Sequence, residues 1–570
     1  MDRRIILAVF LMMVVAVVPS LIFKAPPRPP QALVADSAGV LHDTTAAPTD
    51  PTASAPGATP AAAPAVPATP GAAKAAAPAH EDTVTVTSGS WRLRFSTRGA
   101  RLISAELLTY RSLAPGVKDQ PVELVHRGGS LLDLTVVSGQ DSVALDGWSF
   151  TPSARTLDVA GGPAELTFTG TDGARTVTLT YRFRPDDYRF DVAGQVRGLG
   201  PTGGFLLVHL GDGLPNTEGD TLDNARYHAL VVKPIGKSTS SDPFYKIGAG
   251  KTRAEAGPFT WVASKSKYFV LGFFAPDSSA RWAAAVAQVP EHAAKYAGVA
   301  ALGASMPLTA AGAFRYRVYA GPMEYSHLSA VGDDFDDVNP YGWPGFRTVI
   351  RPFALGFRVV FVWLHTHLAI GYGMAVILIS LLIRLALWPL NQKAMRSAMA
   401  MQAIQPHIKE LQERHKANPE KLQQEMFKLY REHNVNPLGG CLPMLLPMPI
   451  LFALFFVFES TIELRGVSFL WFPDLSQADP LHIIPLVTGI SMFALSRVGQ
   501  RGLPPNPQAK MMMYMTPVMF TFIGWRLAAG LNLYYVVSNL ASLPQQWLIS
   551  EERRKRNLPG TLATPAGGRK

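Results

Sequence analysis

One arginine lies within a long apolar stretch in the second half of the chain, where a charged side chain is unusual. Arg384 follows Ser380 by four residues, so a helix would place both on one face. A guanidinium at membrane depth is costly, and it marks either a water-filled polar cavity or a side chain that snorkels to lipid headgroups. The sequence leaves both interpretations open, and Ser380 favours a polar stripe.

A second polar group lies in the last apolar stretch. Tyr535, Ser538 and Asn539 are separated by three and four residues and share a helix face. They either form hydrogen bonds between helices or line a hydrophilic groove with Arg384. The other polar side chains that would extend such a groove are Asn532, Tyr534, Thr516 and Thr521.

The sequence lacks the residues that several kinds of chemistry require. The single cysteine, Cys441, excludes a disulfide framework, and the histidines have no metal-ligand spacing, so we expect no metal. The Gly250-Lys251-Thr252 run lacks the earlier glycine of a phosphate-binding loop. No apolar stretch carries paired carboxylates or a catalytic constellation, so we expect no cofactor, no enzyme and no proton-coupled pump.

These polar residues belong to a predicted polytopic helical core at residues 368–550. Hydrophobic residues make up 48% of the 570 residues and charged residues only 17%, against about 25% charged in an average soluble chain. This composition excludes a wholly disordered chain and argues against a purely soluble one. An amphipathic interface helix is predicted at 344–367, because arginines interrupt its apolar residues. Five spans are predicted at about 368–390, 438–461, 481–496, 511–525 and 528–549.

The basic residues are distributed unevenly between the connecting segments. Residues 391–437 carry eight lysines and arginines, residues 497–510 carry three, and the tail at 551–570 carries six, whereas Arg465 and Arg526 are alone in the opposite loops. The positive-inside rule therefore predicts that the hairpin and the C-terminus are cytoplasmic. The net charge of +11 is explained by this topology, and we expect no DNA partner, although the tail would suit anionic lipid or ribosomal RNA.

The N-terminal half has three predicted parts. Residues 1–24 contain an uncharged apolar run after Arg3 and Arg4, which indicates an anchor with a cytoplasmic N-terminus; a cleaved signal is the alternative. Residues 25–82 form a linker rich in proline and alanine. Residues 83–343 alternate apolar and polar side chains in short runs, the best of which is a hairpin at 176–192, so we expect a mostly β, sandwich-like domain outside the cytoplasm.

The segment 391–437 is predicted to form a helical hairpin that breaks at Asn418 and Pro419. Its apolar stripes either pack on each other or dock a partner. The residues that would take part in docking are Met395, Met399, Lys409, Arg414 and Lys421. Thirteen of the 18 methionines lie between Met374 and Met519, either as core or as an adaptable apolar surface.

Four motifs resemble signatures of one known family. They are LLIRLALWPLNQKAM at 381–395, NPLGGCLPMLLPMPI at 436–450, LNLYYVVSNL at 531–540 and STRGARLISAELL at 96–108. These motifs resemble the YidC membrane-protein insertases, specifically the Gram-negative type with a large periplasmic domain.

The resemblance implies a function and a site. Five spans would enclose a groove that is open to the cytoplasm and lipid, and closed outside. Arg384 matches the groove arginine, Ser380 a small hydroxyl position, and Tyr534 and Tyr535 the pair that meets the incoming segment. The implied partners are nascent membrane proteins, the Sec translocon, membrane lipids, and ribosomes and targeting factors at the hairpin and tail. The implied localisation is the bacterial inner membrane, and the alternative function is a transporter or flippase-type carrier.

One departure from the family pattern concerns the third span. Pro447 occupies a position where some members are expected to carry a groove-lining glutamine. The polarity of the groove on this span therefore stays open.

Overall fold

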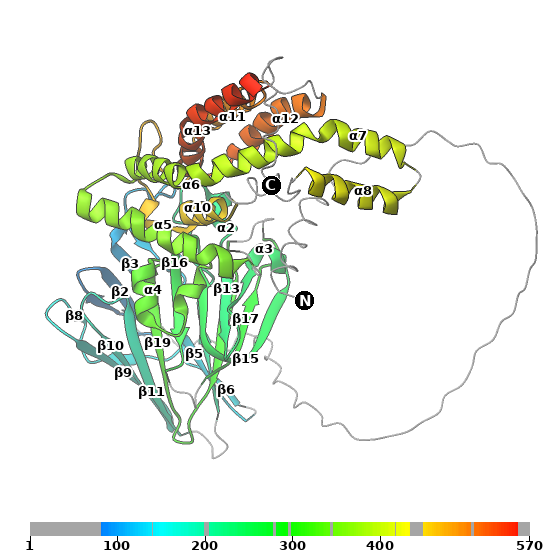
Figure 1. The fold of residues 1–570 in the computed structure, drawn as a ribbon. Coiled ribbons are helices and arrows are strands. Elements are labelled where there is room, and N and C mark those ends of the chain that lie inside the picture. The colour runs from blue at the N-terminus through cyan, green and yellow to red at the C-terminus, as the bar shows by residue number, and fades with distance from the viewer. Residues whose placement is uncertain are drawn as a thin grey trace, which may run out of the picture. The chain divides into compact units, whose positions relative to one another are not determined.

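The computed structural model describes residues 81–139, 141–198, 204–276, 281–293, 298–342, 346–416, 418–433, 448–502 and 507–556 (Figure 1). The predicted anchor, nearly all of the predicted linker, Cys441, Pro447 and the end of the basic tail lie outside the described residues. The side chains of Met395, Met399 and Lys409 also lie outside them.

The described N-terminal region, residues 81–342, is built from two β-sheets. The smaller sheet has five strands in the order β4-β3-β2-β1-β8, and the larger has fourteen. The strands of the smaller sheet are β1 (Thr83–Thr87), β2 (Trp91–Ser96), β3 (Leu102–Arg111), β4 (Pro121–Glu123) and β8 (Thr156–Asp158). The larger sheet contains β5 (Asp133–Ser138), β6 (Asp141–Ala144), β7 (Phe150–Pro152), β9 (Ala164–Asp172), β10 (Arg175–Phe183), β11 (Arg189–Arg197), β12 (Phe205–His209), β13 (Ala229–Pro234), β14 (Ser240–Pro243), β15 (Thr252–Lys265), β16 (Phe269–Phe274), β17 (Trp282–Gln288), β18 (Ala301–Pro307) and β19 (Ala313–Pro322).

The two sheets bury their aromatic side chains against each other. Phe95 on β2 packs on Tyr181 of β10 with ring centroids 4.8 Å apart, and Trp91 lies 5.7 Å from Phe183. The predicted hairpin is confirmed, because β10 and β11 pair antiparallel from Thr176 with Arg197 to Phe183 with Phe190. The alternation of apolar and polar residues identified the strands because one face of each is buried.

Short helices connect or cover the strands. They are α2 (Thr221–Ala225), α3 (Phe244–Ile247), α4 (Tyr325–Val331) and the 3-10 turn η1 (Phe335–Val338). Gly250-Lys251-Thr252 lies in a turn that leads into β15, without a following helix, so it does not form a phosphate-binding loop.

One glycine in the larger sheet makes room for an aromatic ring. Gly194 on β11 faces Phe314 on β19, and a Cβ on Gly194 would lie 2.2 Å from the end of that ring. We expect Gly194→Ala to lower the free energy of unfolding by about 1–3 kcal/mol, because the buried ring must move. Denaturant unfolding followed by tryptophan fluorescence measures this.

Gly303→Ala is the matched control, since a Cβ there would meet only the Val208 carbonyl oxygen at 3.9 Å. Equal effects of the two substitutions would contradict the steric explanation.

The domain also buries an unpaired lysine. Lys265 is 8% exposed, its Nζ donates to the Val338 carbonyl oxygen at 3.2 Å, and burial lowers the pKa of its amine to about 8. Between pH 8 and about 10.5 the folded state loses this proton while the unfolded state keeps it, so Lys265 makes stability rise with pH. We expect Lys265→Met to raise stability at pH 7 and to remove a rise on the order of 3 kcal/mol across this interval.

The measurement is a series of unfolding curves at different pH values for wild type and variant. Lys118→Met, at an exposed site, is the control and should leave the pH dependence unchanged. A pH dependence that survives Lys265→Met would assign it to other groups.

The C-terminal part is helical. Its elements are α5 (Arg347–Leu368), α6 (Tyr372–Ala403), α7 (Gln405–Arg414), α8 (Pro419–Glu432), α10 (Met448–Ser460), the 3-10 turn η3 (Ile462–Leu464), α11 (Ile483–Gly499), α12 (Pro507–Gly524) and α13 (Ala529–Arg556). By length and composition, two helical segments of the described residues are long and apolar enough to cross a membrane, Arg347–Leu368 and Tyr372–Gln392. Two shorter apolar helices are Met448–Ser460 and Ile483–Gly499.

Two helix boundaries differ from the sequence-based expectation. The predicted span at 368–390 corresponds to the apolar segment Tyr372–Gln392, but its helix α6 continues without a break to Ala403. The first arm of the predicted hairpin is instead interrupted at Ile404, and α7 begins with Pro406 in its first turn. Proline has no N–H and fits the first turn of a helix, so it favours a new start there over continuation.

The arginines of α5 all pair with carboxylates outside the apolar helices. Arg347 and Arg351 pair with Asp337 and Asp336 around η1, and Arg358 pairs with Glu463 of η3. These arginines lie along about 16 Å of the helix axis, so α5 as a whole follows the side of the molecule that carries η1 and η3. By length and composition the same helix would also suffice for a span, so the interface helix stays a prediction.

Candidate functional site

Arg384 lies on α6 and faces α13. Its Nη2 is 3.4 Å from the Gln545 Oε1, and Gln545 in turn donates through Nε2 to the Trp388 carbonyl oxygen at 3.0 Å. The Arg384 Nε is buried without a hydrogen-bond partner, and within the described residues no carboxylate lies within 4.0 Å of the guanidinium. The site therefore holds a partly buried positive charge that only neutral polar groups contact.

The polar residues of α13 divide into two stripes. At about 100° per residue, Tyr534, Ser538 and Gln545 fall within about 40° of one another. Tyr534 interacts electrostatically with Arg384 and forms a side-chain hydrogen bond with Ser538. We call these three residues the Arg384 stripe.

The other stripe faces α11 and α12. The Asn539 Nδ2 donates to the Ser491 Oγ on α11 at 3.0 Å, and the Asn532 Nδ2 donates to the Gly524 carbonyl oxygen at the end of α12 at 2.9 Å. The Tyr535 ring lies 6.1 Å from Phe520 on α12. Of the two interpretations left open by the sequence, interhelical hydrogen bonding thus applies to Asn532 and Asn539.

Two of the predicted residues have different surroundings from those expected. Ser380 is fully buried, and its Oγ donates to the Val376 carbonyl oxygen of its own helix at 2.6 Å, so it presents no open polar surface beside Arg384. Thr516 is partly buried on α12, and no contact within the described residues joins it to Arg384. The structure brings Tyr534 and Ser538 to the arginine, but not Ser380, Thr516 or Asn539.

Sequence reasoning missed Gln545, the side chain that contacts the guanidinium. The available signal was its position seven residues after Ser538, which continues the same face for two further turns.

The loop between α10 and α11 closes over the start of α13. The Ala529 N–H donates to the Gln477 carbonyl oxygen at 2.6 Å, and the Gly530 N–H donates to the Leu475 carbonyl oxygen at 2.9 Å. The buried Asp479 accepts hydrogen bonds from the Leu481 and Ile484 N–H groups and so caps the start of α11. This end of the helices is therefore covered by ordered backbone.

The same loop is tied to the β domain by Arg465. Its Nε lies 2.8 Å from Glu218 Oε1, while Nη1 donates to the Arg111 carbonyl oxygen at 2.8 Å and Nη2 to that of Thr217 at 3.0 Å. Both side chains of the ion pair are almost completely buried, at 5% and 3% exposure. Tyr227 and Glu459 form a further hydrogen bond between the β domain and α10.

Helix α8 of the hairpin carries apolar side chains that are only partly covered within the described residues. No side chain of α8 is buried, and Phe427 is 58% exposed. A shallow depression of about 250 Å³ is lined by Leu422, Met426, Phe427 and Tyr430, among others. Arg414 pairs with Glu410 on α7, and the Lys421 N–H donates to the Asn418 Oδ1. Leu422, Met426 and Tyr430 are partly buried within the described residues, so self-packing and docking both remain open for this stripe.

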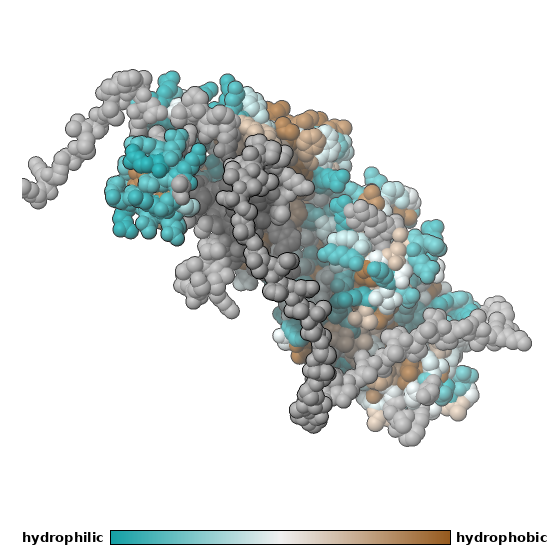
Figure 2. Space-filling view, turned by 90° about the vertical axis from the view of Figure 1, so that its right-hand side faces the viewer, coloured by the Kyte–Doolittle hydropathy of each residue, from teal (hydrophilic) through white to brown (hydrophobic). Residues whose placement is uncertain are grey.

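The methionines of α12 are mostly on the surface. Met511, Met512, Met515 and Met519 are about half exposed, whereas Met513 is buried. Hydrophobic side chains reach the molecular surface in Figure 2 as brown patches. The core interpretation is therefore wrong for most of this helix, and the methionines form an apolar surface.

Comparisons with known proteins cover both halves of the chain. A family model described as 60Kd inner membrane protein matches residues 363–556, and one described as YidC periplasmic domain matches residues 83–354. The membrane protein insertase YidC of Chlorobaculum tepidum is 31% identical over 501 residues, which are 82% of this chain and 81% of that protein. The chain belongs to the YidC family of membrane protein insertases.

A second curated relative agrees with this assignment. The membrane protein insertase YidC of Ralstonia nicotianae is 32% identical over 536 residues, covering 88% of this chain and 90% of the relative. A crystal structure of an active YidC insertase aligns over 82% of this chain and 93% of that chain, with 19% identity and a TM-score of 0.32. Membership of the YidC family confirms the sequence-based expectation of an inner-membrane insertase with a periplasmic domain rather than an enzyme, and it does not favour a transporter.

Proposed function

We propose that this insertase moves apolar segments of nascent membrane proteins into the bilayer along the polar face between α6 and α13, with Arg384 at its centre. The uncompensated guanidinium supports this proposal most directly. A charge inside an apolar helix, contacted by Gln545 but by no described carboxylate, would be offset by an acidic or polar flank of the substrate. Arg384 then lowers the cost of moving that flank out of water.

The driving force in this proposal comes from the substrate. A segment of about twenty apolar residues gains free energy on entering lipid. An acidic flank is drawn outward by about 2.3 kcal/mol per charge per 100 mV of membrane potential. The exposed methionine surface of α12 would accept apolar segments of different shape, because methionine side chains are flexible.

The orientation follows from the charge distribution. We propose a cytoplasmic N-terminal anchor, five spans in the core, and a cytoplasmic hairpin and C-terminus, because the basic residues lie in the segments 391–437, 497–510 and 551–570. The β domain and α5 then lie on the periplasmic side. The partly exposed apolar surface of α8 suits ribosomes or targeting factors as partners. Cooperation with the Sec translocon is a further part of the proposal.

Site-specific photocrosslinking to a stalled single-span nascent chain tests the proposal. A probe at Ser538 should crosslink to the polar flank of the substrate, and a probe at Tyr535 to its apolar segment. Leu540 is the matched control for Ser538. It lies two residues after Ser538 on α13, is 50% exposed and points away from Arg384. Equal crosslinking of the flank from Ser538 and Leu540 would contradict a substrate path along the Arg384 stripe.

A further inference from the structure

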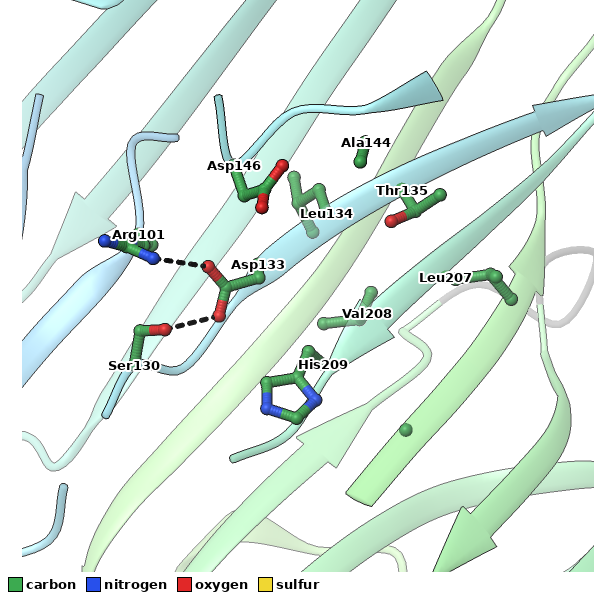
Figure 3. A pocket seen from close by; sticks show the side chains of 11 residues that line it. Arg101, Ser130, Asp133, Leu134, Thr135, Ala144, Asp146, Leu207, Val208 and His209 are labelled. Carbon is green, nitrogen blue, oxygen red and sulfur yellow. Dashed lines mark hydrogen bonds and ion pairs between the residues drawn. The ribbon is translucent and has the colours of Figure 1, made fainter. Parts of the chain in front are cut away.

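The larger sheet of the β domain carries an open polar pocket of about 420 Å³, far along the chain from Arg384 (Figure 3). Its floor crosses three neighbouring strands: Asp133 on β5 pairs with His209 on β12, which pairs with Gly303 on β18. Because side chains alternate along a strand, Asp133, His209 and Gly303 share one face of the sheet. The volume falls in the usual range of small-molecule sites, about 300–1,000 Å³.

Gly303 helps to create the pocket. A Cβ at this position would have only the Val208 carbonyl oxygen nearby, at 3.9 Å, so the space above the strand is empty. A larger residue in place of Gly303, beside His209, would fill that space. The hollow therefore depends on a missing side chain beside His209.

One wall of the pocket contains two buried polar atoms without hydrogen-bond partners. Asp133 accepts a hydrogen bond from the Ser130 Oγ through Oδ2 at 2.6 Å, while its Oδ1 lies 3.6 Å from the Arg101 Nη1. The Asp133 Oδ1 and the Arg101 Nε are buried, and neither has a hydrogen-bond partner within the described residues. Buried polar atoms normally have such partners, so this wall offers one acceptor and one donor to a ligand.

The other polar groups of the pocket define the kind of ligand. Figure 3 shows the Asp146 carboxylate near Arg101 and Asp133, with His209 on the other side of Asp133. Asp146 has no ion-pair partner within the described residues. Two carboxylates disfavour an anion. Arg101 lies 3.6 Å from Asp133 and 3.7 Å from Glu81, and its positive charge beside Asp133 repels a cationic amine.

A metal ion fits less well. No group of three histidine, cysteine or acidic side chains within the described residues is arranged to hold one. A hydroxyl group can donate to a carboxylate and accept from a guanidinium at the same time. Several hydroxyl groups on one small neutral molecule would match this wall together with His209.

We propose that this pocket binds a neutral saccharide, either free in solution or carried as a lipid headgroup. One ring hydroxyl donates to the Asp133 Oδ1 and accepts from the Arg101 Nε. Neighbouring hydroxyls reach Asp146 and His209, and the ring occupies the space above Gly303. The β domain then contributes recognition of a hydroxyl-rich ligand in addition to the insertion activity of the helices.

The test is saturation-transfer NMR on the full chain in lipid nanodiscs that contain no sugar-based detergent. Maltose, cellobiose and chitobiose are the probes, with spermidine and calcium as competitors. We expect binding of at least one disaccharide, and an affinity at least about tenfold lower in Asp133→Asn, because a hydrogen bond to a charged group is lost. Gly303→Met should reduce binding to a similar degree by filling the pocket.

Ala301→Met is the matched control, since Ala301 is exposed on the same strand and face but does not line the pocket. A thermal unfolding curve for each variant separates lost binding from lost folding. Dodecyl maltoside added to the nanodiscs distinguishes a lipid headgroup from a free saccharide. If it displaces the bound disaccharide more strongly than free maltose does, the ligand is a headgroup. If it displaces the disaccharide more weakly, the ligand is a free sugar. No transfer to any disaccharide, equal binding by all variants, or displacement by spermidine or calcium would overturn the proposal.

Discussion

Arg465→Ala is expected to lower the free energy of unfolding by about 3–5 kcal/mol, because the substitution leaves a buried carboxylate without its partner. Arg465 and Glu218 are 5% and 3% exposed. The guanidinium also binds the Arg111 and Thr217 carbonyl oxygens and lies 5.3 Å from the ring centroid of Phe269. All of these contacts disappear together.

The shift of the Glu218 pKa indicates how costly it is to bury this carboxylate without the Arg465 side chain. Burial raises this pKa above its ordinary value even though Arg465 opposes the change. Without the arginine the carboxyl group would take up a proton at a still higher pH. We therefore expect the loss of stability to be larger at pH 8 than at pH 6, since the unpaired charge must then be buried.

The measurement is denaturant unfolding of the full chain in nanodiscs at both pH values. Arg155→Ala is the matched control: Arg155 pairs with Asp82 at 2.9 Å, but the two side chains are 76% and 48% exposed, so it should cost less than about 1 kcal/mol. A shift for Arg465→Ala no larger than that of the control would show that the buried pair contributes little to joining the loop to the β domain.

Arg384→Ala is expected to reduce insertion of a single-span substrate with an acidic flank by at least about tenfold. The estimate rests on one hydrogen bond to a charged group, worth about 1.5–3 kcal/mol, formed while the flank crosses the apolar layer. A substrate of the same apolar sequence with a neutral flank should lose much less. The difference between the two substrates therefore reports on the charge rather than on folding.

The measurement is protease protection of radiolabelled substrate in vesicles that contain wild type or variant. Arg384→Lys keeps the charge and should retain most of the activity, whereas Gln545→Leu removes the neutral neighbour and should have a smaller effect than Arg384→Ala. If the acidic and neutral flanks lose insertion equally in Arg384→Ala, the arginine acts as a structural anchor and not as a partner of the flank.

The sequence alone determined the elements and the family. The hairpin at 176–192 was predicted because period-two alternation reflects one buried face. β10 and β11 do pair antiparallel there, although β11 continues to Arg197. The helices of the core were predicted from apolar runs in the sequence. Such a run is recognisable by itself, because a segment in a nonpolar environment needs apolar side chains along its whole length. The motifs around Arg384 and Tyr534 were sufficient to indicate the YidC family.

Only the tertiary structure decided which polar residues meet. The polar residues of α13 cover a wide arc of the helix, and periodicity states which of them share a face but not which neighbour each face contacts. In the packed helices Asn539 contacts Ser491, and Gln545 contacts Arg384. The pairing of Arg465 with Glu218, 247 residues apart, and the pocket above Gly303 likewise arise from distant segments, because they depend on how the folded elements pack and not on the local sequence.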